Sequence, residues 1–155
     1  MSLKGLNPPQ REAATTIHGP VLILAGAGTG KTKVVTTRIG YMVAQGINPE
    51  NILAVTFTNK AAAEMRERVE LVVTKQEAKK VTISTFHSLC VRILRKNIDK
   101  LGYKKNFTIY SGGDQVGLVR KLIARNSGKD ENLDPNTALS LIGRAKNMGV
   151  PVSEY

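Results

Sequence analysis

Two patterns of apolar and polar positions alternate along the chain. One is a short apolar run rich in β-branched residues, and the other is a longer segment with helical spacing of its apolar residues. The apolar runs are residues 21–24, 52–57, 81–84 and 107–110. Helical spacing covers residues 31–45, 59–71 and 86–101, and a glycine follows the first and the third of these segments. Strands that alternate with helices of this length predict right-handed βαβ units. The pattern therefore predicts an α/β fold with a mainly parallel sheet that is covered by helices on both faces.

Both ends of the chain carry helical signals of their own. In LNPPQREAA, Asn7 can cap a helix in which Pro8 is the first residue. Later the pattern becomes wholly helical, in two segments that the polar linker KDENLDP joins. We therefore expect a first domain over residues 1–110 and the beginning of a helical subdomain over residues 111–155. The chain stops at VPVSEY without a closing element, so we expect a fragment of a longer protein.

Length and composition limit the class of protein. The 155 residues, of which 41% are hydrophobic, suffice for one buried core or for one compact domain and part of a second. The longest apolar runs are too short to span a bilayer, and the N-terminus lacks the apolar segment of a signal peptide. A single cysteine, Cys90, fits a reducing compartment. We expect a cytoplasmic protein with no membrane partner.

The charge balance favours a polyanionic partner. The formal net charge is +11, a large excess for a chain of this size. Part of it lies on the segment after residue 86, where Arg92, Arg95 and Lys96 share a helical face. That face could follow a phosphate backbone or could be ordinary solvated surface, and charge alone does not decide between these alternatives.

The most specific motif joins the first apolar run to the first long helical segment. In AGAGTGKT, glycines allow positive φ angles and let backbone N–H groups approach phosphate oxygens, while the following helix adds the positive end of its dipole. Lys31 can reach the β- and γ-phosphates, and the Thr32 hydroxyl suits Mg²⁺. The motif predicts a nucleoside triphosphate site formed by Ala25, Gly26, Ala27, Gly28, Thr29, Gly30, Lys31 and Thr32, with Lys31 and Thr32 as its catalytic residues and Thr32 as the metal ligand.

This motif does not by itself identify a function. Ala25 occupies the position where the usual pattern begins with glycine. The alternative interpretation is a glycine-rich turn with an incidental lysine. Kinases, GTPases, transporters and helicases all use such a loop, so the reaction must be inferred from other segments.

Four segments in order, LNPPQREAA, LAGAGTGKT, AVTFTNKAAAEMRERV and ISTFHSLCVRILR, closely resemble the UvrD/Rep family of superfamily-one DNA helicases. The resemblance implies a P-loop NTPase fold of the RecA-like type. In that fold, residues 1–110 would be the N-terminal part of the first ATP-binding domain, and residues 111–155 the beginning of a helical insert. It also implies that the complete protein hydrolyses ATP to move 3′→5′ along single-stranded DNA and to unwind duplexes, with ATP and Mg²⁺ as cofactors.

The resemblance also assigns roles to particular residues. Gln10 would bind adenine, since an amide matches N6–H and N7 of that base. Contacts to single-stranded DNA would come from Phe57, Thr58, Asn59, Lys60, Thr85, Phe86 and His87. Three alternatives stay open: Gln10 as a solvated residue of a first helical turn, Phe57 as a core residue followed by a capping Asn59, and His87 as a structural histidine.

Some features of the family are missing from this sequence. Lys33 stands where the family commonly has an arginine associated with the base, and lysine lacks the planar stacking surface. No Asp-Glu pair ends an apolar strand, and we assign no catalytic role to Asp130 and Glu131 of the polar linker. We therefore expect weak nucleotide binding and little turnover from this chain alone.

The expected partners are single-stranded DNA, single/double-strand junctions, and proteins of repair or replication. Two other functions remain open: a different P-loop enzyme, such as a small-molecule kinase or a GTPase, and a non-catalytic nucleic-acid-binding module with an ATP fold.

Overall fold

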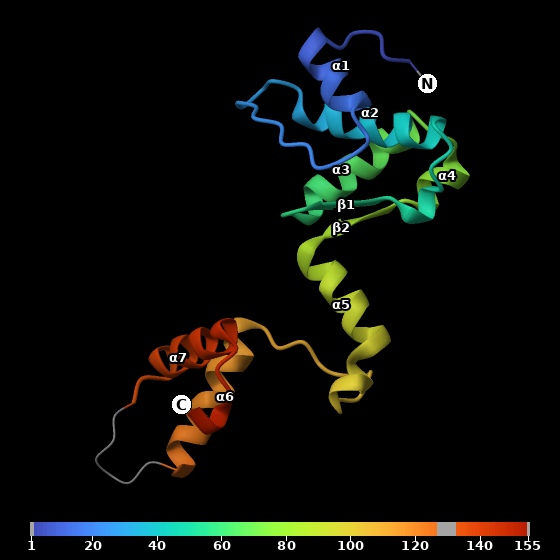
Figure 1. Cartoon of the computed structure of the whole chain (residues 1–155). Coiled ribbons are helices and arrows are strands. Elements are labelled where there is room, and N and C mark those ends of the chain that lie inside the picture. The colour runs from blue at the N-terminus through green and yellow to red at the C-terminus, as the bar shows by residue number, and fades with distance from the viewer. Residues whose placement is uncertain (1, 127–132, 155) are drawn as a thin grey trace. The chain divides into compact units, whose positions relative to one another are not determined.

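The computed structural model describes residues 2–126 and 133–154 (Figure 1). It divides the chain into two compact units, Met1–Lys105 and Asn106–Tyr155. The elements of the first unit are α1 (Pro8–Thr15), α2 (Lys31–Ala44), η1 (Pro49–Asn51), β1 (Leu53–Thr56), α3 (Asn59–Glu70), α4 (Lys75–Lys80), β2 (Thr82–Thr85), α5 (Phe86–Asn97) and η2 (Ile98–Leu101). Those of the second are α6 (Gly112–Asn126), α7 (Pro135–Met148) and η3 (Val152–Glu154). Asp130 and Glu131 of the polar linker lie outside the described residues.

A two-stranded parallel sheet forms the centre of the first unit. β1 and β2 pair from Leu53↔Thr82 to Thr56↔Thr85, and α3 and α4 lie between them in the chain. Side chains alternate between the faces of a strand, so the paired residues Ala54 and Ile83 share one face. Both are buried in the main core. The predicted combination of helices with parallel strands is confirmed.

The core of the first unit joins α2, α3 and both strands. α2 packs on α3, and α3 packs on the sheet. At their contact Val69 is fully buried and Ile39 is 2% exposed. The remaining buried residues of this cluster are Ile52, Ala54, Ala62, Ala78, Val81 and Ile83. A smaller cluster of Leu6, Ala14 and Val34 holds α1 against α2. α2, which begins at the end of the glycine-rich segment, and α3, which begins after Thr58, therefore share the main core.

Two of the four predicted strands are wrong. Residues 21–24 and 107–110 form no strand, whereas the runs at 52–57 and 81–84 contain β1 and β2. Leu22 is 84% exposed and Leu24 is 87% exposed, so the first run is not the buried central strand that its composition predicts. The physical reason is pairing: a strand needs a hydrogen-bonded neighbour, and in the described residues β1 and β2 pair only with each other.

The second unit consists of α6 packed on α7. Ser111 and Asp114 form reciprocal hydrogen bonds at the beginning of α6. The Asp134 carboxylate caps α7 by accepting from the Thr137 N–H at 2.9 Å, and this backbone hydrogen bond lowers the pKa of the Asp134 carboxyl. α7 ends at Gly149, whose φ is 70°. None of the helices in the described ranges is long and apolar enough to cross a membrane.

Candidate functional site

The glycine-rich loop turns sharply into α2. Gly28 has a φ of 73° and Gly30 a φ of 84°, both in the left-handed region that favours glycine. The Thr29 hydroxyl donates to the Gly26 carbonyl at 2.8 Å and closes the turn. Gly30 is the N-cap of α2. These glycines thus give the loop a backbone path that other residues would adopt only with strain.

The N-terminus of α2 differs from those of the neighbouring helices. α1, α3, α4 and α5 each begin at a residue whose side chain accepts a backbone N–H, namely Asn7, Thr58, Thr74 and Thr85. Gly30 has no side chain to do so, and no side chain of the described residues caps α2. The free N–H groups of its first turn, with the positive end of the helix dipole, are suited to an anion.

Lys31 lies back over the loop. Its Nζ donates to the Gly26 carbonyl at 2.5 Å and to the Ala25 carbonyl at 3.3 Å. Thr32 follows, half-buried in the first turn of α2. A cavity of about 250 Å³ adjoins Lys31, and its lining also includes Asn7, Gln10, Ile23 and Thr29. The ammonium group therefore lies within the loop, with two backbone carbonyls as its acceptors.

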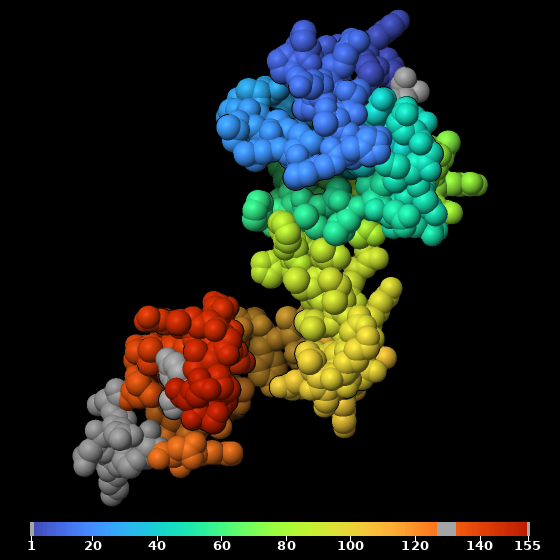
Figure 2. All heavy atoms as spheres, in the orientation of Figure 1, coloured from blue at the N-terminus to red at the C-terminus, as the bar shows by residue number. Residues whose placement is uncertain are grey.

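Gln10 lies beside the same loop, although 19 residues separate it from Thr29. Its Nε2 donates to the Thr29 carbonyl at 3.0 Å, and its Oε1 accepts the Asn7 N–H at 3.1 Å. Figure 2 shows the N-terminal segment, in dark blue, packed directly against the segment of the loop and α2, which runs from blue to cyan. Both ends of the Gln10 amide are thus engaged, and Gln10 connects the beginning of α1 to the glycine-rich turn.

Two further side chains of α2 hold α1 in place. Lys33 Nζ donates to the Gly5 carbonyl at 2.7 Å. Arg38 Nη1 donates to the Ala13 carbonyl at 2.8 Å and also to the Thr16 carbonyl, at the C-terminal end of α1. Arg38 was not predicted from the sequence, because its contact with Ala13 joins residues 25 apart and no local pattern specifies it.

A pair of aromatic rings lies where the two strands end. Phe57 follows β1 and Phe86 follows β2; their centroids are 5.7 Å apart and the rings are tilted by 45°. Phe57 is 87% exposed and Phe86 is 48% exposed. The alternative that Phe57 is a core residue is therefore wrong. The parallel register, which places Thr56 beside Thr85, brings the two rings together.

The other predicted DNA contacts surround this pair and divide into two groups. Asn59, Lys60 and His87 are exposed in the first turns of α3 and α5. The two threonines cap those helices: the Thr58 hydroxyl accepts the Ala61 N–H at 3.1 Å, and the Thr85 hydroxyl accepts the Ser88 N–H at 3.2 Å. Thr85 is buried, so its side chain positions α5 and does not face solvent. Asn59 is not the cap of α3.

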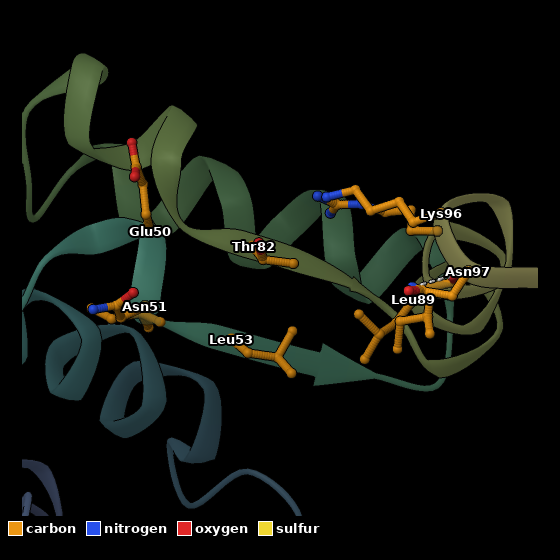
Figure 3. A pocket seen from close by; sticks show the side chains of 10 residues that line it. Glu50, Asn51, Leu53, Thr82, Leu89, Lys96 and Asn97 are labelled. Carbon is orange, nitrogen blue, oxygen red and sulfur yellow. Dashed lines mark hydrogen bonds between the residues drawn. The ribbon is translucent and has the colours of Figure 1, made fainter. Parts of the chain in front are cut away.

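A second cavity, of about 260 Å³, lies between the sheet and α5 (Figure 3). Leu53 and Leu89 give it apolar walls, while Arg92 and Lys96 bring cationic side chains to it. Arg95 donates instead to the Lys105 carbonyl. None of the predicted site residues lines this cavity. Arg92 and Lys96 thus line this cavity while Arg95 reaches the Lys105 carbonyl, so the three basic residues have different surroundings.

These features define a class of protein: a mixed α/β protein in which parallel strands and a glycine-rich turn each lead into the N-terminus of a helix. Within that class the chain belongs to the UvrD/REP helicase N-terminal domain family, which matches residues 6–155. The resemblance expected from the four segments is confirmed.

Several bacterial proteins are similar to this chain. One is the ATP-dependent DNA helicase PcrA of Bacillus subtilis (strain 168), which is 49% identical over 146 residues. The ATP-dependent DNA helicases PcrA of Staphylococcus epidermidis (strain ATCC 12228) and Staphylococcus aureus (strain NCTC 8325) are each 44% identical over the same length. Each match covers 94% of this chain and 20% of the relative. The chain therefore spans about a fifth of the length of these relatives.

Proposed function

We propose that the chain is the N-terminal portion of an ATP-dependent 3′–5′ DNA helicase, with a RecA-like fold in residues 1–110 and the beginning of a helical insert in residues 111–155. One observation carries the proposal: an uncapped helix N-terminus follows a glycine-rich turn that holds Lys31 and adjoins Gln10. The PcrA relatives, named as ATP-dependent DNA helicases, support it.

The residues around the loop fit ATP and Mg²⁺. The N–H groups of the loop and of the first turn of α2 would bind the phosphates, and Lys31 would exchange its two carbonyl acceptors for phosphate oxygens. Thr32 would hold Mg²⁺, which neutralises charge on the phosphates when it is bound. To bind adenine, Gln10 would break its hydrogen bond to the Thr29 carbonyl or the one from the Asn7 N–H. Since Thr29 is part of the loop, binding of the base would then change a contact of the loop.

The chain alone would bind nucleotide weakly and hydrolyse little. Hydrolysis requires acidic residues at the metal and an arginine near the transferred phosphate, and the sequence has no Asp-Glu pair at the end of an apolar strand. Lys33, bound to the Gly5 carbonyl, would act on α1 and not on the base. Because Lys33 would not contact the base, selection of adenine over guanine would depend on Gln10.

The end of the sheet would bind single-stranded DNA. Phe57 offers an exposed ring to a base, and Lys60, Asn59 and His87 lie in the adjoining first turns of two helices, where phosphate oxygens are favoured. The same proposal includes junctions of single- and double-stranded DNA as substrates. It also includes protein partners in repair or replication, and a location in the cytoplasm.

Gln10→Ala is expected to reduce the preference for ATP over GTP. Removing one or two hydrogen bonds to adenine costs about 0.5–1.5 kcal/mol each, so ATP binding should weaken roughly 2- to 150-fold while GTP binding changes little. Competition against a fluorescent nucleotide measures both. Asn7→Ser is the control, because serine keeps a side-chain cap on α1 and leaves the Gln10 amide in place. Equal losses for ATP and GTP would contradict a role for Gln10 in base recognition.

Binding of single-stranded DNA is expected to weaken steeply as salt is added. Each phosphate contact releases counterions, which gives a slope of about −0.7 in a plot of log affinity against log salt. Lys60→Gln should make the slope shallower by about that amount. Lys79→Gln removes the same charge near the amino end of β2, and it should leave the slope unchanged. A flat salt response, or equal effects of the two variants, would count against the proposed DNA surface.

A further inference from the structure

The aromatic pair at the end of the sheet is built asymmetrically. Phe57 is the residue directly after β1 and has 87% of its surface exposed, whereas Phe86 opens α5 and has 48% exposed. The backbone at Phe86 is fixed by the buried Thr85, whose hydroxyl accepts the Ser88 N–H and donates to the Ser88 hydroxyl at 2.9 Å. Phe86 is therefore the anchored member of the pair, and Phe57 is the member that solvent reaches.

The geometry of the pair excludes a base from the space between the rings. Stacked bases in a nucleic acid strand are about 3.4 Å apart, so a base held between two rings needs nearly parallel planes about 6.8 Å apart. The Phe57 and Phe86 centroids are 5.7 Å apart with an interplanar angle of 45°. Such a tilted arrangement is a favourable contact between the two rings themselves. Phe57 therefore meets Phe86 at a tilt, and most of its ring surface stays open to solvent.

We propose that Phe57 stacks on a base of single-stranded DNA through its outer face only, and that Phe86 is a positioning residue that holds the Phe57 ring without touching DNA. This inference rests on the proposed function of this edge. Without a neighbour, an exposed phenylalanine populates several rotamers, and stacking would have to fix one of them. The contact with Phe86 fixes the ring in advance, so the ordering cost is met by folding and not by binding.

The test compares two ligands on variants of the 155-residue chain, by fluorescence anisotropy. One ligand is a labelled oligothymidylate, and the other is an oligonucleotide of equal length whose sugars lack bases. Phe57→Ala should weaken binding of the oligothymidylate roughly 5- to 150-fold, as expected for loss of a base stack. Phe86→Ala should weaken it about 2- to 12-fold, as expected for loss of a ring contact.

Three further results are expected from a positioning role. The double variant should bind the oligothymidylate no more weakly than Phe57→Ala, because Phe86 acts only through the Phe57 ring. Neither substitution should change binding of the ligand without bases. Phe86→Tyr should restore normal affinity, since it retains the ring, whereas Phe86→Leu should not; the leucine variant also keeps an apolar side chain at the beginning of α5.

The outcomes separate this inference from the proposed function. Unchanged oligothymidylate binding by Phe57→Ala would refute the DNA surface and the inference together. If Phe57→Ala weakens binding but Phe86→Ala does not, or if the two losses add in the double variant, only the positioning role is wrong. Equal loss of both ligands in Phe86→Ala would show a general structural role, and it too would overturn the inference.

Discussion

Replacing Lys31 with alanine is expected to weaken ATP binding by roughly 10- to 150-fold. The Lys31 ammonium lies within the loop at 2.5 Å from the Gly26 carbonyl, and in the proposed complex it would donate to phosphate oxygens instead. A hydrogen bond to a charged group contributes about 1.5–3 kcal/mol, which corresponds to that range. Isothermal titration calorimetry of the chain with Mg²⁺-ATP measures the loss directly.

The matched control for this prediction is Lys33→Ala. It removes the same charge two residues along the same helix, but Lys33 Nζ donates to the Gly5 carbonyl and not to the loop. We expect it to change ATP affinity far less than Lys31→Ala. Equal losses of ATP affinity in the two variants would mean that the positive charge attracts ATP at long range and that Lys31 makes no specific contact with it. No loss in either variant would refute the phosphate site.

The turn of the loop and the start of α2 could be predicted from the sequence, whereas the connection of the loop to α1 could be predicted only in part. Glycines followed by Lys31 and a helical pattern specify a turn and a helix start within a few residues, and the structure has α2 beginning at Lys31. The resemblance placed Gln10 near the nucleotide. The hydrogen bonds of Gln10 to Thr29 and of Arg38 to Ala13 depend on how α1 packs across α2, which no local pattern specifies.

The strands show the same limit. The runs at 52–57 and 81–84 become β1 and β2 because each is the other's partner, four residues in register. The run at 21–24 has equally strong β propensity, yet it forms no strand in the described residues. Propensity is local, but a strand exists only through its neighbour. Alternation along 52–57 also could not decide whether Phe57 is buried, since Phe57 lies just beyond the last paired residue.

The two proposed sites are connected through the main core. α2 begins at the glycine-rich loop, and α3 begins two residues after Phe57. These helices pack on each other, and Ile39 of α2 and Val69 of α3, which are 2% and 0% exposed, belong to the core that they share. Interiors of this kind are close-packed, so a shift of one helix is transmitted to the other. The sites proposed at the phosphate loop and at Phe57 thus lie near the beginnings of two helices that share one core.

Ile39→Ala is therefore expected to have the largest effect on stability. Truncating a buried isoleucine to alanine costs about 2–5 kcal/mol, a large part of the 5–15 kcal/mol that is typical of a folded domain. Urea unfolding followed by circular dichroism should show a lower midpoint. Ile93→Ala makes the same chemical change at a residue that is 52% exposed, and it should cost much less. If Ile39 joins the two sites as proposed, urea that partly unfolds Ile39→Ala should remove ATP and DNA binding in parallel. Loss of one activity at lower urea than the other would show that α2 and α3 unfold separately.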